Sequence, residues 1–490
     1  MFEAAELDNP MSKKDYDNKF PKARIKLFSM QRELKKAGIP VLILLDGVPG
    51  AGRGELINLL NEWMDSRNIR NRTFWMTTDA ERRHPEYWRY WRILPGKGEV
   101  GIFFGGWYAH SAKKALGGKL KNAKFEQIMN EAQGFERILL NDGMLIIKLW
   151  MHLDGKTYAG VMKKRKGKGA DPLVSGNKDL QKASYDEIIK IYSKAIRLTD
   201  IAGAHWYLIN CRDHRARNIA VIETLISCMQ SALDLKAVQK QDEAPASPVT
   251  SSQTKFILDS VDLSKSVEPK DYVKEIKKYQ TALNELTIKA FKKNVSTVVL
   301  FEGWDAAGKG GAIRRLTSSI DARIRQTIQI AAPTDEEKSY HYLWRFWRHL
   351  PGAGFVTIYD RSWYGRVLVE RVEGFASAIE WSRAYEEINS FERQLIEKGA
   401  ALVKIFLHIS QEEQLRRFKE RETCEWKNYK ITEDDWRNRE KYEDYIKAMN
   451  DMFIRTSTDI APWHIIPADN KHYARVEALR IICDSIGKKL

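Results

Sequence analysis

Short apolar runs alternate with longer stretches of helical periodicity along the second half of this chain. Such compact apolar runs are typical of strands that are buried on both faces of a parallel sheet. Between two of them, Ile388, Phe391 and Leu395 fall on one face of a helix. The alternation predicts an α/β fold, in which crossover helices join parallel strands. The predicted strands are Val298–Phe301, Phe355–Tyr359, Ala401–Leu407 and His464–Ile466.

One segment, residues 411–445, departs from this pattern. It is dense in charged residues and its apolar stripe is weak. We expect it to be a helical excursion from the core, a lid over a site.

The same pattern occurs twice along the chain, at a constant offset of 256 residues (Gly303 against Gly47). The runs Leu42–Leu45 and Gly47–Gly54 align without a gap with 298–301 and Gly303–Gly310. A tandem duplication explains this agreement, with domains at 1–235 and 256–490 and a linker at 236–255 that is rich in Pro, Ser, Ala and Thr. Further matching pairs are Trp88 with Trp344, Leu94 with Leu350, Trp107 with Trp363, Lys148 with Lys404, and His152 with His408.

The composition adds a candidate class of partner. The 490 residues carry a net charge of +16, with 43% hydrophobic and 30% charged residues. This balance is ordinary for a soluble globular protein, and the positive charge favours a polyanion: nucleic acid, an anionic membrane surface or a phosphate polymer. A basic protein without such a partner is the alternative.

The sequence also bears on where the protein works. No apolar run approaches the ~18 residues of a membrane span, and the N-terminus has no secretory signal. The four cysteines lack paired or metal-type spacing, which fits a reducing compartment. We therefore expect a cytoplasmic protein without a membrane span.

The segment 303–310 has the features of a phosphate-binding loop. It follows a predicted strand and precedes a predicted helix, so backbone N–H groups of Gly303, Gly308 and Gly310 can approach phosphate oxygens while Lys309 supplies a positive charge. In a standard loop of this kind Ser or Thr follows the Lys and helps to hold Mg²⁺. Here that position is Gly310, so a metal needs other ligands.

Two carboxylates are candidates for that role. Asp305 lies within the loop, and Asp360 ends a predicted strand, where side chains of a parallel sheet face the site. Two carboxylates suit Mg²⁺, which prefers oxygen ligands and keeps several waters. A helix cap is the alternative role for Asp360. Arg361, the next residue, can reach a phosphoryl group.

The first copy keeps the scaffold but not these charged residues. Asp305 is replaced by Pro49, Lys309 by Arg53, Asp360 by Phe104 and Arg361 by Gly105. We expect that the first half retained the fold and lost the site.

Other basic residues cluster near the proposed site. Arg345 and Arg348 recur in the first copy as Arg89 and Arg92, so structural and functional roles both stay open. Trp344 and Trp347, at helical spacing, are expected in the core. Arg366 and Arg371 follow the second strand of this half and add to the positive charge.

These residues resemble the polyphosphate kinase 2 family, a branch of the P-loop kinases. The resemblance covers nearly all of 256–490, while the first half shares the scaffold only. It implies a P-loop kinase-like three-layer sandwich with a parallel sheet, here duplicated, with the lid in the second copy. The motifs that carry it are Gly303–Gly310, Pro333–Glu337, Asp360–Arg371, Arg417–Arg421 and Ala461–Trp463.

The resemblance also implies roles for single residues. Asp305, Lys309, Asp360 and Arg361 would be catalytic, with Asp305 and Asp360 holding Mg²⁺. Candidates for binding polyphosphate or nucleotide are Arg366, Arg371, Arg417, Arg421 and Lys427.

Two fused copies are similar to the branch that transfers a phosphoryl group from inorganic polyphosphate to a nucleoside monophosphate, typically AMP to ADP. The alternatives are a nucleotide kinase that uses ATP and a polyanion-binding protein with a vestigial loop. Nucleic acid is not an expected partner, and a homo-oligomer is left open.

Overall fold

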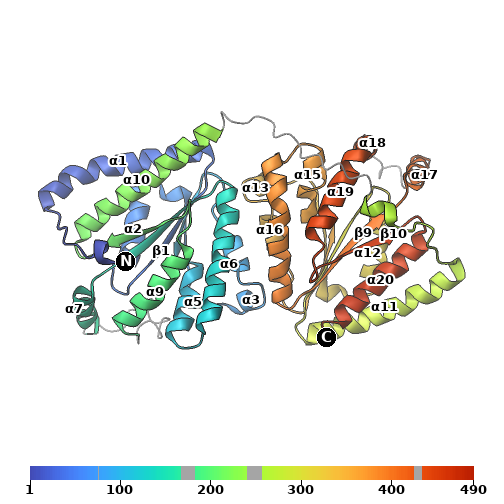
Figure 1. The fold of residues 1–490 in the computed structure, drawn as a ribbon, viewed down its shortest axis with the longest axis horizontal. Helices are drawn as coiled ribbons and strands as arrows, with labels where there is room; N and C mark the ends of the chain where they lie inside the picture. Colours follow the sequence, from blue (N-terminus) through green and yellow to red (C-terminus); the bar gives the residue numbers. More distant parts are fainter. Residues whose placement is uncertain (75–76, 167–182, 240–255, 424–432) are drawn as a thin grey trace. The chain divides into compact units, whose positions relative to one another are not determined.

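The computed structural model describes residues 1–74, 77–166, 183–239, 256–423 and 433–490. The chain forms two compact units (Figure 1). One comprises Met1–Thr78, Arg89–Ala244 and Asp335–His341, and the other comprises Asp79–Trp88, Pro245–Thr334 and Tyr342–Leu490. Each contains one five-stranded parallel sheet. The domain limits 1–235 and 256–490 stay a prediction. A helix that reaches Gln239 covers the start of the predicted linker, and 240–255 lie outside the described residues.

The first sheet has the order β2-β3-β1-β4-β5 and is flanked by helices on both faces (Figure 1). Its strands are β1 (Val41–Gly47), β2 (Ile69–Thr73), β3 (Val100–Phe104), β4 (Leu145–His152) and β5 (Trp206–Asn210). The helices α1 (Lys13–Ala37), α2 (Arg53–Trp63) and α10 (His214–Gln239) form one layer, and α5 (Trp107–Leu116), α6 (Asn122–Asn141) and α9 (Tyr185–Thr199) form the other. Shorter elements of this repeat are η1 (Glu3–Ala5), η2 (Ser66–Asn68), α3 (Asp79–Arg82), α4 (Trp88–Trp91) and α7 (Gly155–Lys166).

The second sheet repeats this strand order as β7-β8-β6-β9-β10. Its strands are β6 (Thr297–Gly303), β7 (Arg325–Gln329), β8 (Val356–Asp360), β9 (Ala401–His408) and β10 (Trp463–Pro467). The layers are α11 (Pro269–Lys292), α12 (Lys309–Thr317) and α20 (Lys471–Gly487) on one face, and α16 (Ala378–Glu397) and α19 (Tyr442–Thr456) on the other. Shorter elements are η3 (Ile257–Ser260), η4 (Ala322–Ile324), α13 (Asp335–Lys338), α14 (Trp344–Arg348), η5 (Trp363–Arg366) and α15 (Val369–Val372).

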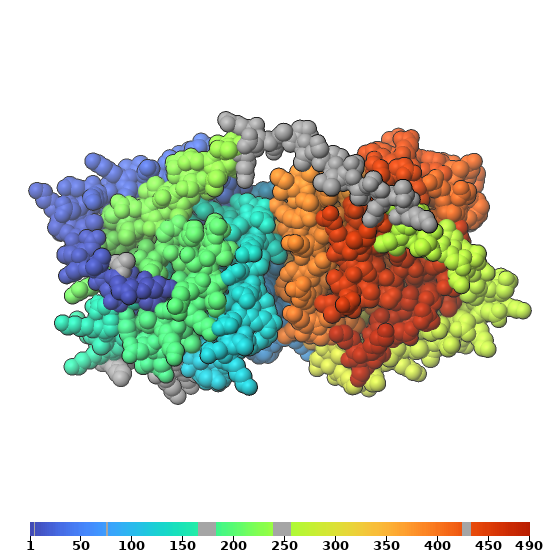
Figure 2. Space-filling model, in the orientation of Figure 1, coloured from blue at the N-terminus to red at the C-terminus, as the bar shows by residue number. Residues whose placement is uncertain are grey.

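The two units also share a pairing of helices that are far apart in the sequence. In the first unit α1 packs along α10, and in the second unit α11 packs along α20. Figure 2 shows each pair as neighbouring ridges on the surface. The predicted α/β sandwich and its duplication are therefore confirmed.

The four strands predicted in the second half are confirmed as β6, β8, β9 and β10. The central strand β6 is buried along nearly its whole length, and its Val299 pairs with Ile358 of β8 and Val403 of β9. The prediction missed β7, because this edge strand carries exposed polar residues on a sequence without an apolar run. The same is true of β2 in the first unit.

The core of the second unit contains the tryptophans expected there. Trp344 and Trp347 are buried, as the helical spacing predicted. The rings of Trp347 and Trp363 each meet Phe391 of α16 edge-on, with ring centroids 4.9 Å apart.

The expected lid contains two helices, α17 (Gln411–Glu422) and α18 (Glu433–Glu440), in the charged segment. It ends earlier than the predicted residue 445, because Tyr445 and Ile446 of α19 are buried and belong to the core. Residues 424–432, and with them Lys427, lie outside the described residues.

Each unit contains a buried lysine that forms an ion pair with a buried glutamate. The Lys404 ammonium on β9 has no exposed side-chain surface and donates to Glu392 of α16 (2.9 Å), the Tyr364 hydroxyl (3.0 Å) and the Thr456 carbonyl (2.6 Å). Trp363 Nε1 and the Tyr364 hydroxyl also donate to Glu392. In the first unit Lys148 pairs with Glu136 (2.9 Å) and donates to the Thr199 carbonyl, and Trp107 and Tyr108 donate to Glu136. Such charges are tolerated because each is paired with an opposite charge and has further hydrogen-bond partners.

We expect Lys404→Ala to destabilise the second unit by about 3–5 kcal/mol, since it leaves the Glu392 carboxylate buried without a counter-charge. The double variant Lys404→Met/Glu392→Gln should regain part of that loss because it buries no charge. Urea unfolding measures both. Lys447→Ala, which removes an exposed pair with Asp444, is the control and should change stability little. A loss in Lys404→Ala as small as in the control would contradict this account of the pair.

Candidate phosphate-binding site

The loop between β6 and α12 has the backbone geometry of an anion cradle. Gly303 adopts φ +141°, and a Cβ there would collide with the backbone of Leu407 in β9. Gly308, at φ +107°, is the residue that caps the start of α12. The first N–H groups of a helix lack intrahelical acceptors and carry the positive end of the helix dipole. The loop and the start of α12 therefore offer phosphate oxygens a site.

Lys309, the first residue of α12, folds back over this loop. Its ammonium donates to the carbonyls of Gly303 (2.6 Å) and Trp304 (3.1 Å). Burial lowers the pKa of Lys309, although the neighbouring Asp305 carboxylate opposes this. The lysine charge thus lies at the loop and is held there by two backbone carbonyls.

Asp305 is held from two sides. One carboxylate oxygen accepts from Arg361 Nη2 (3.2 Å), and the other accepts from Asn438 Nδ2 of α18 (2.9 Å). Burial alone would raise the pKa of Asp305, but the positive charges of Lys309 and Arg361 outweigh it and the pKa falls below its usual value. Asp305 is therefore an anion at neutral pH.

The carboxyl end of β8 brings the second carboxylate to the same place. Arg361 adopts φ +62°, a strained conformation for a non-glycine residue, and its N–H donates to the Phe301 carbonyl of β6 (3.1 Å). The turn puts Asp360 and Arg361 beside the loop. Next to them, the Ser362 hydroxyl donates to Glu302 at 2.7 Å. Burial raises the pKa of Glu302, opposed by that hydrogen bond.

A cavity of about 970 Å³ joins these residues. Asp305, Lys309, Asp360 and Arg361 all line it, and their catalytic and metal-binding roles stay a prediction. The segment after β7 forms another part of the wall, and the lid contributes Arg421 with part of α18. Sequence reasoning did not find the lid residues Asp434, Asp435 and Asn438, since a uniformly charged stretch shows no face that distinguishes them.

The other basic candidates are committed to protein contacts. Arg366 pairs with Glu370 (3.2 Å) and lies over the Tyr342 ring, and Arg371 pairs with Asp451 (2.8 Å) and lies over the Trp381 ring. Neither lines the cavity. Arg348 covers the Trp344 ring, while Arg345 both donates to the Ala331 carbonyl and lines the cavity. Substrate binding by Arg366 and Arg371 stays a prediction that these contacts do not favour.

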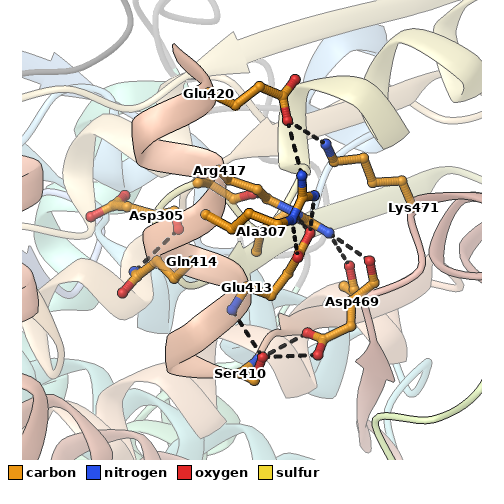
Figure 3. Close-up of polar contacts among 12 residues, drawn as sticks. Asp305, Ala307, Ser410, Glu413, Gln414, Arg417, Glu420, Asp469 and Lys471 are labelled. Carbon is orange, nitrogen blue, oxygen red and sulfur yellow. Dashed lines mark hydrogen bonds and ion pairs between the residues drawn. The ribbon is translucent and has the colours of Figure 1, made fainter. Parts of the chain in front are cut away.

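Arg417 has a structural task beneath the loop (Figure 3). Its side chain is 2% exposed and pairs with Glu413. One guanidinium nitrogen donates to the carbonyls of Ala306 (2.9 Å) and Ala307 (3.1 Å), and another donates to those of Ala468 (2.6 Å) and Asp469 (2.9 Å). It therefore ties the phosphate loop to the end of β10. The sequence suggested an anion contact because it shows charge but not burial.

The corresponding loop of the first unit is neutralised internally. Arg53, which replaces Lys309, pairs with the buried Asp46 at 3.1 Å and lies over the ring of Phe104 at 4.9 Å. Its side chain is 12% exposed. The positive charge of this loop is thus satisfied by its own unit.

Comparisons with known proteins agree with this duplicated architecture. The family model for "Polyphosphate kinase 2 (PPK2)" matches residues 10–237 and 266–490. The chain belongs to the polyphosphate kinase 2 family. A polyphosphate:AMP phosphotransferase of Pseudomonas aeruginosa is 43% identical over 99% of this chain and 98% of its own length. One of Pseudomonas syringae pv. tomato is 43% identical over 100% and 98%.

A solved structure extends the likeness to the fold. The crystal structure described as a polyphosphate kinase 2 from Pseudomonas aeruginosa is 42% identical, with a TM-score of 0.88, and covers 100% of this chain and 99% of that chain. This structural likeness, like the match to the family model, spans both copies. In the described ranges, none of the helices combines the length and apolar character that crossing a membrane requires.

A buried histidine, His408 of β9, holds Trp304 of the phosphate loop in place. Trp304 Nε1 donates to His408 Nδ1 (3.0 Å), and the Trp304 ring stacks on Tyr442 at 4.6 Å. Since the indole N–H is only a donor, His408 Nδ1 must accept and stay unprotonated. Burial lowers the pKa of His408 to about 4, with Asp469 opposing.

This depressed pKa predicts a loss of stability in mild acid. In the unfolded chain His408 takes up a proton below about pH 6.5. In the folded chain it takes up that proton only below about pH 4. Stability is therefore present above the unfolded pKa and lost as pH falls, by about 2 kcal/mol between pH 7 and 5. Urea unfolding of His408→Gln, whose amide oxygen can accept from Trp304, should lose that much less over the same interval. Equal losses in both proteins would refute the assignment.

Proposed function

We propose that the second unit transfers a phosphoryl group from inorganic polyphosphate to AMP and forms ADP. The observation that carries the proposal is the single cavity that joins the phosphate loop, two carboxylates and the cations Lys309 and Arg361. Full-length relatives that are named polyphosphate:AMP phosphotransferase support the choice of substrates.

The reaction needs charge neutralisation and alignment more than covalent chemistry. A phosphate oxygen of AMP attacks the terminal phosphorus of the polymer. A new P–O–P bond forms, the bridging P–O bond to the terminal phosphorus breaks, and the shortened polyphosphate leaves with that electron pair. In this scheme the loop N–H groups and Lys309 hold phosphate oxygens, and Arg361 lies where charge develops.

Asp305 and Asp360 are the residues that would hold Mg²⁺. In the part of the chain that the structure describes, no group of three or more His, Cys, Asp or Glu side chains is arranged to bind a metal by itself. Two carboxylate ligands nevertheless fit Mg²⁺, which takes its remaining oxygens from water and substrate phosphates. When bound, the ion would neutralise phosphate charge and orient the reacting groups.

The donor follows from charge and family together. Polyphosphate carries about one negative charge per phosphate, and binding to a basic surface releases counterions as for nucleic-acid backbones. The net charge of +16 suits such a polymer. A vestigial polyanion-binding loop is disfavoured, since the second unit retains all four residues that the first unit has replaced.

A cytoplasmic location belongs to the same proposal. Among the described residues, Cys211, Cys228 and Cys483 are free thiols, which suit a reducing compartment.

The direct test combines AMP, polyphosphate and Mg²⁺ without ATP and follows ADP by chromatography. We expect ADP to form, and removal of Mg²⁺ with a chelator to stop its formation. If ATP supported phosphorylation of AMP far better than polyphosphate under matched conditions, the donor would be wrong and an ATP-dependent kinase would replace the proposal.

Single substitutions should show which of the two units carries the catalytic activity. Asp305→Asn, Asp360→Asn and Lys309→Met should each lower turnover at least ~10²-fold, because each removes charge stabilisation of the transition state. Arg53→Ala, in the corresponding loop of the first unit, is the matched control and should change turnover little. Steady-state rates are measured in the full-length protein, with circular dichroism to verify folding. Substantial activity remaining in Asp360→Asn would show that the first unit carries a working site.

A further inference from the structure

Helix α18 contacts the phosphate loop through the side-chain amide of Asn438. Asn438, in the middle of α18, donates from Nδ2 to Asp305 Oδ2 at 2.9 Å. The Tyr445 hydroxyl of α19 donates to Asn438 Oδ1 at 3.0 Å. Because an ionised carboxylate can only accept, the amide nitrogen must face Asp305, and the amide oxygen then accepts from the hydroxyl. The orientation of the Asn438 amide is therefore fixed at both its nitrogen and its oxygen.

The contact completes the set of groups around Asp305. Arg361 takes one carboxylate oxygen and Asn438 the other, while Gln414 Nε2 of α17 donates to the Asp305 backbone carbonyl at 3.2 Å. Figure 3 shows Gln414 reaching Asp305 from the helix that also carries Arg417. Rotation of the carboxylate is thus limited by Arg361 and Asn438, while Gln414 holds the backbone of the same residue.

Helix α18 is docked by contacts other than Asn438. Glu373, whose side chain is 6% exposed, forms ion pairs with Arg437 (3.1 Å) and Lys441 (3.0 Å). Arg439 donates to the Gln411 carbonyl (2.9 Å) and to Gln414 Oε1 (3.0 Å). These attachments keep α18 docked when Asn438 is removed, so loss of the amide should loosen the helix without releasing it.

We propose that Asn438 is a positioning residue, which orients the Asp305 carboxylate and couples the docking of the lid helix α18 to the phosphate loop. The inference rests on the proposed function, in which Asp305 holds Mg²⁺. A hydrogen bond to a metal-binding carboxylate sets its direction, and loss of such a partner typically costs 10–100-fold in metal affinity or activity. Undocking of α18 would release one Asp305 oxygen, so lid position and metal affinity change together.

The test measures metal binding without turnover. Mg²⁺ is titrated by calorimetry into the full-length protein with AMP present and polyphosphate absent. Asn438→Ala should weaken Mg²⁺ binding by at least ~10-fold. Tyr445→Phe keeps the amide but frees its orientation, so a smaller loss is expected. Glu440→Gln, an exposed change on the same helix, is the matched control and should bind Mg²⁺ as the wild type does.

Backbone amide hydrogen exchange of 433–440 provides the second measurement. It should quicken in Asn438→Ala, and an added Asp305→Ala should cause no further increase, because both substitutions remove the same contact. Wild-type Mg²⁺ affinity in both Asn438→Ala and Tyr445→Phe would overturn the inference. Failure of the proposed function is separate, since it would appear as a wild-type protein that forms no ADP from polyphosphate.

Discussion

A charged group buried away from water must be neutralised and fully hydrogen-bonded, and in each unit this requirement fixes the frame on which the site is built. Lys404 joins β9 to α16 through Glu392, to η5 through Tyr364 and to the end of α19 through the Thr456 carbonyl. The element η5 begins only a few residues after Asp360 and Arg361. Holding Tyr364 in place therefore also holds the turn that brings those two residues to the phosphate loop. The same arrangement around Lys148 supports the fold of the first unit, where Arg53 and Phe104 stand in place of Lys309 and Asp360.

The two units separate what the fold needs from what the site needs. The buried lysine, its glutamate and the neighbouring Trp-Tyr pair remain in both. The loop residues diverged together: a cation that would bind phosphate became Arg53, now neutralised by Asp46 and covered by Phe104. Once a site no longer binds an anion, a free positive charge over a helix N-terminus is unfavourable, and an internal ion pair with a ring over it relieves the repulsion.

Sequence reasoning identified the parts of the structure that are marked by a residue pattern along the chain. Apolar runs located β6, β8, β9 and β10, and the repeat comparison singled out Asp305, Lys309, Asp360 and Arg361, four of the charged residues that line the cavity. The polar edge strand β7 was missed because only a buried strand needs an apolar run. The role of Arg417 was not visible either, since the same guanidinium serves for phosphate or for carbonyls, and burial depends on Ala468 and Asp469, which lie far along the chain. Asn438 left no signal at all, because its partner Asp305 is distant in the sequence and its neighbours are equally polar.

Lys309 shows how the loop can be ordered before a substrate arrives. Its ammonium is satisfied by the carbonyls of Gly303 and Trp304, and Arg417 holds the carbonyls of Ala306 and Ala307 further along the loop. A bound phosphate would replace neutral carbonyl acceptors by anionic oxygens, and hydrogen bonds between charged groups are shorter and stronger than those to neutral acceptors. The lysine therefore gains interaction energy on binding without any need to assemble the loop. The buried arginine therefore supports the loop, and the neighbouring lysine can exchange its carbonyl acceptors for phosphate oxygens. The planar guanidinium binds several fixed acceptors at once, which suits the first role. The compact ammonium moves readily from one acceptor to another, which suits the second.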